Sequence, residues 1–203
     1  MNISVLRAAQ KSFLEQYPGG FAHEELQAIG KKHKMDEMVA MTRAACQKAK
    51  FAQPEQLMQQ VVKIISKSSM ISVFDKPKMK DAVAAMSRVD KEALVGYLYE
   101  WLHGKEKVGF EGWVQEWRRH KMGRWPVVTA IPAYYRPQKE IFVKPNTTKL
   151  IIEQLELDVC YHSTPTWDFY RRYRKLILEL KAQAPKIQAP NNPAFCGFLM
   201  MAL

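Results

Sequence analysis

Through the first 120 residues, apolar side chains recur every three or four positions, a spacing that places them on one face of an α-helix. Breaks in this spacing fall at residues that end or begin helices: Pro18-Gly19-Gly20, the cap candidates Asp36 and Asp90, Pro54 and Gly104. A short β-branched run over residues 70–74 is either a brief strand or an ordered loop. The pattern predicts helices over residues 3–17, 23–34, 36–50, 54–65, 79–86, 90–103 and 110–120.

The pattern changes after Gly123. Val127, Thr129 and Ile131 follow a period of two, and residues 141–143 form a second apolar run. Residues 133–140 between them have the polarity and the proline of a turn, so the sequence predicts a β-hairpin that neighbouring helices support. We expect helices again over residues 146–157 and 165–184, then an extended arm over 185–193 and an apolar tail over 195–203 that packs on the domain or on a partner.

Together these elements predict a mainly α protein, in which one helical domain, residues 1–203, has a small β-hairpin before its last two helices. A chain of 203 residues buries about 70% of its unfolded surface, which is enough for a core without disulfides or metals. A subdivision is possible into a helical half (1–104), a helix–hairpin–helix half (105–184) and an extended tail (185–203).

Cysteine usage and hydropathy favour a reducing compartment. Cys46, Cys160 and Cys196 are odd in number and widely spaced, unlike the paired cysteines of a secreted scaffold. The first 21 residues contain no continuous apolar signal segment. No apolar run approaches the roughly 20 residues that span a bilayer. We therefore expect a cytoplasmic protein without membrane association.

Net charge is the main indication of function. Against 20 Asp and Glu there are 31 Lys and Arg, giving a formal charge of +11 and a pI near 9.6, which is typical of proteins that bind nucleic-acid phosphates. The leading hypothesis is non-enzymatic binding to the phosphate backbone, and the alternative is that these cations form solvated helix faces. The candidate binding residues are Arg118, Arg119, Lys121, Arg124, Arg136, Lys139, Arg171, Arg172, Arg174 and Lys175.

A winged-helix variant of this hypothesis uses the hairpin. In that arrangement Arg136 and Lys139 lie at the tip of the wing, next to phosphate. On the last long helix, Asp168 is three and four residues before Arg171 and Arg172, so it partly neutralises them.

Two other functions are open. A protein-interaction or assembly subunit, including a homo-oligomer, would use the apolar tail and the methionine side chains, which otherwise fill the core. An enzyme would need a site formed only in three dimensions, since GxSxG, SxxK, HExxH, CxxC and a phosphate-binding glycine loop are all absent. The candidate partner residues are Phe195, Phe198, Leu199 and Met200.

Metal ligands and cofactor motifs are sparse. Cys160 and His162 are two residues apart and are able to face one side of a strand, but no second pair accompanies them. The sequence therefore predicts no metal and no cofactor, and it identifies no catalytic residue.

The second half of the chain resembles a family of uncharacterised bacterial proteins, and Phe13–Phe21 is similar to the start of the same proteins. No activity or site residue is known for that family, so the resemblance implies none here. The residues that carry it are Trp125-Pro126, Thr129, Pro132, Pro137, Phe142-Val143-Lys144-Pro145, Thr148, Leu157, Tyr161, Pro165, Trp167 and Tyr170.

Overall fold

The structure, a computed structural model, describes residues 1–203 and consists of helices joined by short connections, with no strand. Each of the seven ranges expected to be helical before residue 121 overlaps one α-helix, with ends that differ by up to five residues, and residues 70–74 form a loop. The helices are α1 Ile3–Gln16, η1 Gly20–Ala22, α2 Glu24–His33, α3 Met35–Ala45, η2 Lys48–Ala52, α4 Pro54–Lys67, α5 Asp75–Ala85, α6 Arg88–His103, α7 Glu106–Arg119, α8 Trp125–Tyr135, α9 Pro145–Gln154, α10 Trp167–Gln183, η3 Pro185–Ile187 and α11 Asn192–Ala202.

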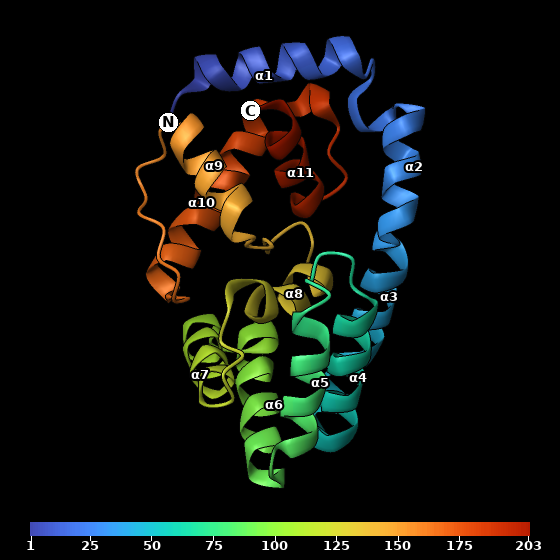
Figure 1. Ribbon diagram of the computed structural model, residues 1–203, viewed down its shortest axis with the longest axis vertical. Helices are drawn as coiled ribbons and strands as arrows, with labels where there is room; N and C mark the ends of the chain where they lie inside the picture. The colour runs from blue at the N-terminus through green and yellow to red at the C-terminus, as the bar shows by residue number, and fades with distance from the viewer.

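The helices gather at the two ends of an elongated molecule, with α8 between them (Figure 1). At one end α1 crosses over α9, α10 and α11, and α11 packs against α1, α9 and α10. At the other end α4 packs on α5 and α6, and α6 on α7, while α2 and α3 run along one side. α8 touches α3, α4 and α7. The buried apolar side chains form one continuous cluster from Leu6 to Leu199.

The segment predicted as the first strand of a hairpin is the helix α8. Nine of its eleven residues are buried, and a helix that is apolar on every side shows no amphipathic period. Its β-branched residues Val127, Val128 and Ile131 have high strand propensity, so the sequence pattern of this helix resembles that of a strand. The predicted β-hairpin is wrong, and the winged-helix arrangement that depended on it is wrong with it.

Two prolines occupy α8 for different reasons. Pro126 lies in the first turn, where the missing N–H has no partner to lose. Pro132 lies inside the helix and cannot donate to the carbonyl of Val128, four residues earlier. The indole Nε1–H of Trp113 donates to that carbonyl instead, at 3.1 Å. A side chain of α7 thus compensates for the proline and ties α7 to α8.

The chain after α8 returns along that helix. The N–H of Val143 donates to Thr129 Oγ1 at 3.1 Å, and the same hydroxyl donates to the Trp125 carbonyl at 2.7 Å. Both groups are buried, so each hydrogen bond satisfies a polar atom that water does not reach. Val143 therefore has a side-chain partner on α8, and the N–H of Ile141 donates to the Tyr170 hydroxyl of α10 at 3.4 Å, in place of the bonds to a neighbouring strand.

The C-terminal segment packs on the rest of the chain. In place of the extended arm expected over 185–193, η3 forms and α11 begins, capped by the side chain of Asn191. α11 contacts α1, α9 and α10. Three of the four candidate partner residues lie in the core: Phe195, Phe198 and Leu199. The fourth, Met200, lies at the surface, where it contacts the Thr147 hydroxyl.

The three thiols differ in exposure. Burial raises the pKa of Cys46 and of Cys196 to about 12, whereas Cys160 is exposed. Because only the thiolate is an effective nucleophile, we expect a maleimide at neutral pH to modify Cys160 rapidly and the other two only after unfolding. Mass spectrometry of the labelled chain checks this, and a Cys160→Ser variant should lose the fast reaction. Rapid modification of two or three thiols in the folded protein would contradict the buried placement.

None of the helices combines the length and the apolar composition that crossing a membrane requires.

Candidate functional site

The structure divides the ten candidate basic residues into three groups. Four exposed cations lie in the last turn of α7 and in the residues that follow it, and we call them the basic turn: Arg118, Arg119, Lys121 and Arg124. Arg171, Arg172 and Lys175 are exposed on α10 and form the α10 basic face. The other three, Arg136, Lys139 and Arg174, are engaged with buried or half-buried carboxylates.

The basic turn is shaped by the way α7 ends. The N–H of Met122 donates to the Trp117 carbonyl at 2.8 Å, and the N–H of Lys121 donates to the Arg118 carbonyl at 2.9 Å. Lys121 has a left-handed backbone, with φ of 59°. These features define a Schellman motif, which closes the helix and exposes its last side chains. Cations at this position also complement the negative end of the helix dipole.

Only part of the basic turn is neutralised by acids. Arg119 donates to Glu116 Oε2 at 2.8 Å, and Arg124 donates to Asp75 Oδ1 at 2.9 Å. Arg118 and Lys121 make no ion pair. The basic turn therefore presents two cations that no carboxylate of the chain offsets.

The α10 basic face is more evenly balanced. Asp168 pairs with Arg171 at 3.8 Å and with Arg172 at 3.1 Å, and Glu179 pairs with Lys175 at 3.7 Å. Such exposed pairs are worth at most about 1 kcal/mol, so another anion readily replaces the carboxylate. An open hollow of about 440 Å³ lies along this face; its lining residues are Arg171, Arg174, Lys175, Leu178, Glu179 and Ala182.

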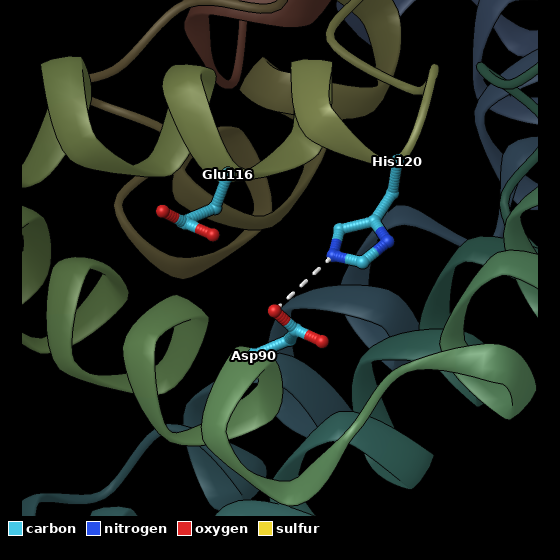
Figure 2. Close-up of side chains that lie close together, drawn as sticks. All are labelled: Asp90, Glu116 and His120. Carbon is cyan, nitrogen blue, oxygen red and sulfur yellow. Dashed lines mark ion pairs between the residues drawn. The ribbon is translucent and has the colours of Figure 1, made fainter.

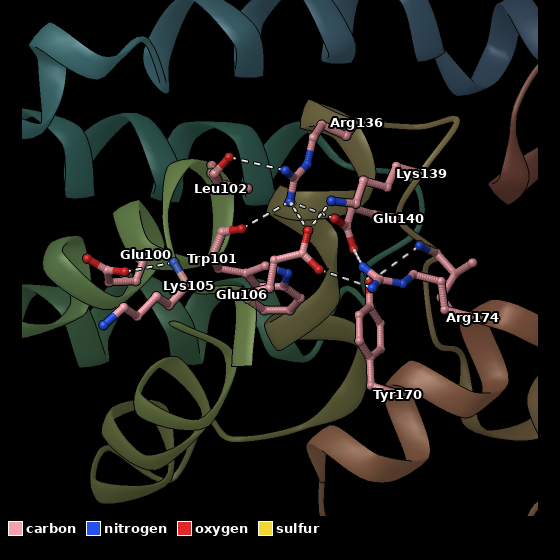
Figure 3. A network of polar contacts seen from close by, with 11 residues as sticks. Glu100, Trp101, Leu102, Lys105, Glu106, Arg136, Lys139, Glu140, Tyr170 and Arg174 are labelled. Carbon is pink, nitrogen blue, oxygen red and sulfur yellow. Dashed lines mark hydrogen bonds and ion pairs between the residues drawn. The ribbon is translucent and has the colours of Figure 1, made fainter. Parts of the chain in front are cut away.

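Arg136 and Arg174 converge on Glu140, whose side chain is 0% exposed (Figure 3). Arg136 donates to one carboxylate oxygen and Arg174 to the other, each at 2.7 Å. The Tyr170 hydroxyl donates to the second oxygen at 2.8 Å. Arg136 also donates to the carbonyls of Trp101 and Leu102, the end of α6, at 3.0 and 3.1 Å.

Glu106 extends these contacts toward the surface. It accepts hydrogen bonds from Lys139 and from Arg174, the latter at 3.1 Å. Burial by itself raises the pKa of Glu106, but the two cations outweigh burial and hold that pKa below its usual range. Burial, reinforced by the Glu140 charge, raises the pKa of Tyr170 well above its ordinary value. We call Glu106, Arg136, Lys139, Glu140, Tyr170 and Arg174 the Glu140 network.

The Glu140 network joins α6, α7, the turn after α8, and α10. Its three cations are paired with two carboxylates; the Arg136 and Arg174 side chains are largely buried, whereas the Lys139 side chain is 48% exposed. Sequence patterns did not separate Arg174 from its exposed neighbour Arg171, because the carboxylates that bind Arg174 are 34 and 68 residues away.

Sequence patterns also missed a group of potential metal ligands. Asp90, from the first turn of α6, faces His120 at the end of α7, and Glu116 lies one turn earlier on α7 (Figure 2). One ligand atom from each of the three residues lies within 4.8 Å of the others. The available signal was the spacing of Glu116 and His120, which places both on one helix face. Cys160 and His162, in contrast, belong to no such group.

Asp90 has a structural role as well. The N-cap of α6 is Ser87, and not Asp90 as the sequence predicted. Asp90 completes the capping box, because it accepts hydrogen bonds from the Ser87 N–H at 3.1 Å and from the Ser87 hydroxyl at 2.6 Å. The hydrogen bonds from Ser87 lower the pKa of Asp90, and the bond from the Ser87 hydroxyl has a larger effect than the bond from its N–H. Both use Oδ2, which leaves Oδ1 facing His120 and Arg119.

Comparisons of the chain with protein-family models, with curated proteins and with solved structures find no match. The resemblance of the second half to uncharacterised bacterial proteins therefore stays a prediction.

Proposed function

We propose that this protein binds nucleic acid through its phosphate backbone, with the basic turn as the main contact and the α10 basic face as a second one. The observation that carries the proposal is the pair Arg118 and Lys121, two exposed cations three residues apart without an acidic partner. Guanidinium and ammonium groups of this kind neutralise phosphates and release counterions. The formal charge of +11 adds a long-range attraction to any polyanion.

The arrangement favours backbone contact over base reading. The basic turn lies at the end of α7, and the helix that begins directly after it, α8, is buried at nine of its eleven residues, so no exposed helix is placed to reach into a groove. Phosphate contacts position a protein on a duplex without selecting sequence. We therefore expect similar affinity for duplexes of different sequence.

The test is the salt dependence of binding to a short labelled DNA duplex, followed by fluorescence anisotropy between roughly 50 and 200 mM salt. Each lost phosphate contact lowers the magnitude of the negative slope of log affinity against log salt by about 0.9. We expect the double variant Arg118→Gln, Lys121→Gln to lower it by about 1.8, and Arg171→Gln, Lys175→Gln to lower it by up to the same amount.

A matched control removes the same charge elsewhere. Lys48 and Lys50 of η2 are exposed and unpaired, so Lys48→Gln, Lys50→Gln also reduces the net charge by two. This control should leave the slope nearly unchanged. If it lowers the slope as much as the basic-turn variant does, or if the wild-type protein shows no binding at low salt, the proposal fails.

A further inference from the structure

Asp90, Glu116 and His120 are arranged as ligands around a common point between two helices. His120 Nε2 and Asp90 Oδ1 are 3.8 Å apart, too far for a hydrogen bond. Two coordination bonds of about 2.1 Å to one ion span such a separation at an open angle. Glu116 lies one turn earlier on α7, with its carboxylate to one side of this gap and one ligand atom within 4.8 Å of those of Asp90 and His120 (Figure 2).

A second observation is independent of the spacing. His120 Nε2 is buried and has no hydrogen-bond partner. A buried polar atom that lacks a partner costs free energy and needs an explanation, such as an ion or a water. The unpartnered atom is the one that faces Asp90, and the His120 side chain as a whole is 21% exposed. The His120 side chain therefore reaches the surface while its Nε2 is covered.

We infer that Asp90 Oδ1, a Glu116 oxygen and His120 Nε2 bind one divalent cation. One imidazole with two carboxylates suits Mn²⁺, Fe²⁺ or Zn²⁺ better than Ca²⁺, which prefers oxygen ligands alone. The Ser87 hydrogen bonds to Asp90 fix the orientation of this ligand, as outer partners do in metal sites. The inference does not depend on nucleic-acid binding.

Arg119 is the competitor of the ion. Its guanidinium donates to Glu116 Oε2 and lies 3.7 Å from Asp90 Oδ1, so it neutralises part of the charge that would attract a cation. Its side chain is mostly exposed, so it is free to move outward when an ion binds. Removing this charge should therefore strengthen metal binding. A cluster that only holds Arg119 in place would show no such gain.

The probe is Mn²⁺, because the hard ion has little affinity for the three cysteine thiols. Free Mn²⁺ is measured by electron paramagnetic resonance as it is titrated into the full-length protein. We expect the wild type to bind one Mn²⁺ per chain. Binding should be about tenfold or more weaker for His120→Ala and for Glu116→Gln. It should be about two- to fivefold stronger for Arg119→Gln. The matched control is His162→Ala, which removes an exposed histidine outside the cluster and should bind Mn²⁺ as the wild type does.

Asp90→Asn is unsuitable as the main variant because it also weakens the capping box. Circular dichroism of each variant establishes that its helices remain folded. Absence of saturable Mn²⁺ binding to the wild type would overturn the inference. Binding that His120→Ala and Glu116→Gln leave unchanged would place the ion elsewhere and overturn it equally.

Discussion

Replacing Glu140 by glutamine is expected to lower the free energy of unfolding by about 3–5 kcal/mol. The carboxylate is fully buried and is the common acceptor of Arg136 and Arg174, whose side chains are 23% and 13% exposed. The variant would leave both guanidinium groups inside the protein facing a neutral amide, whose NH₂ group cannot accept their hydrogen bonds. The loss comes mainly from these largely buried cations, which would have Glu106 as their one remaining carboxylate, and less from the pair itself.

Denaturant unfolding followed by circular dichroism measures this loss. Asp168→Asn is the matched control, because Asp168 also pairs with two arginines but its side chain is 66% exposed. That variant should change the free energy of unfolding by less than about 1 kcal/mol. If Glu140→Gln costs no more than Asp168→Asn, the Glu140 network does not hold the helices together as described.

Replacing Gly109 by alanine is expected to destabilise the fold by about 2–3 kcal/mol. Gly109 is buried where α7 crosses α6, and a Cβ there would overlap the backbone of Trp101 and lie 2.7 Å from the carbonyl carbon of Glu100. Backbone atoms of a helix cannot move aside as a flexible side chain does, so the two helices would have to separate. The overlap outweighs the roughly 1 kcal/mol that alanine gains over glycine inside a helix.

Gly96→Ala provides the comparison on the same pair of helices. Gly96 lies in α6, and a Cβ at that position meets no atom within 4 Å. Only the propensity effect remains, so this variant should gain up to about 1 kcal/mol. Thermal unfolding of both variants separates the two effects, and a neutral or stabilising Gly109→Ala would contradict the close approach of α6 and α7.

Most helices were predictable because their signals are local. In α4, the buried Leu57, Val61 and Ile64 follow the helical period, and Pro54 marks the first turn. The approximate bounds of these helices follow from spacing and caps alone. The four candidate binding residues of the basic turn are exposed, as cations in and after the last turn of a helix commonly are.

α8 was not predictable as a helix because it is buried on all sides. Neighbouring elements cover it, so it lacks the polar face that reveals a helix. Its internal Pro132 also argues against a helix in isolation. Only the indole of Trp113, which comes from another helix, replaces the hydrogen bond that this proline removes.

The sequence by itself determined the helical class, most helix positions and the excess of positive charge. Each of these depends on composition or on residues within one or two helical turns. Only the tertiary structure decided which charges are available, because Arg174 meets Glu140 and Glu106 across 34 and 68 residues. The same holds for Asp90 and His120, which face each other because α6 and α7 pack together. Side chains that are close in sequence thus have different roles, since long-range packing sets which carboxylate each cation meets.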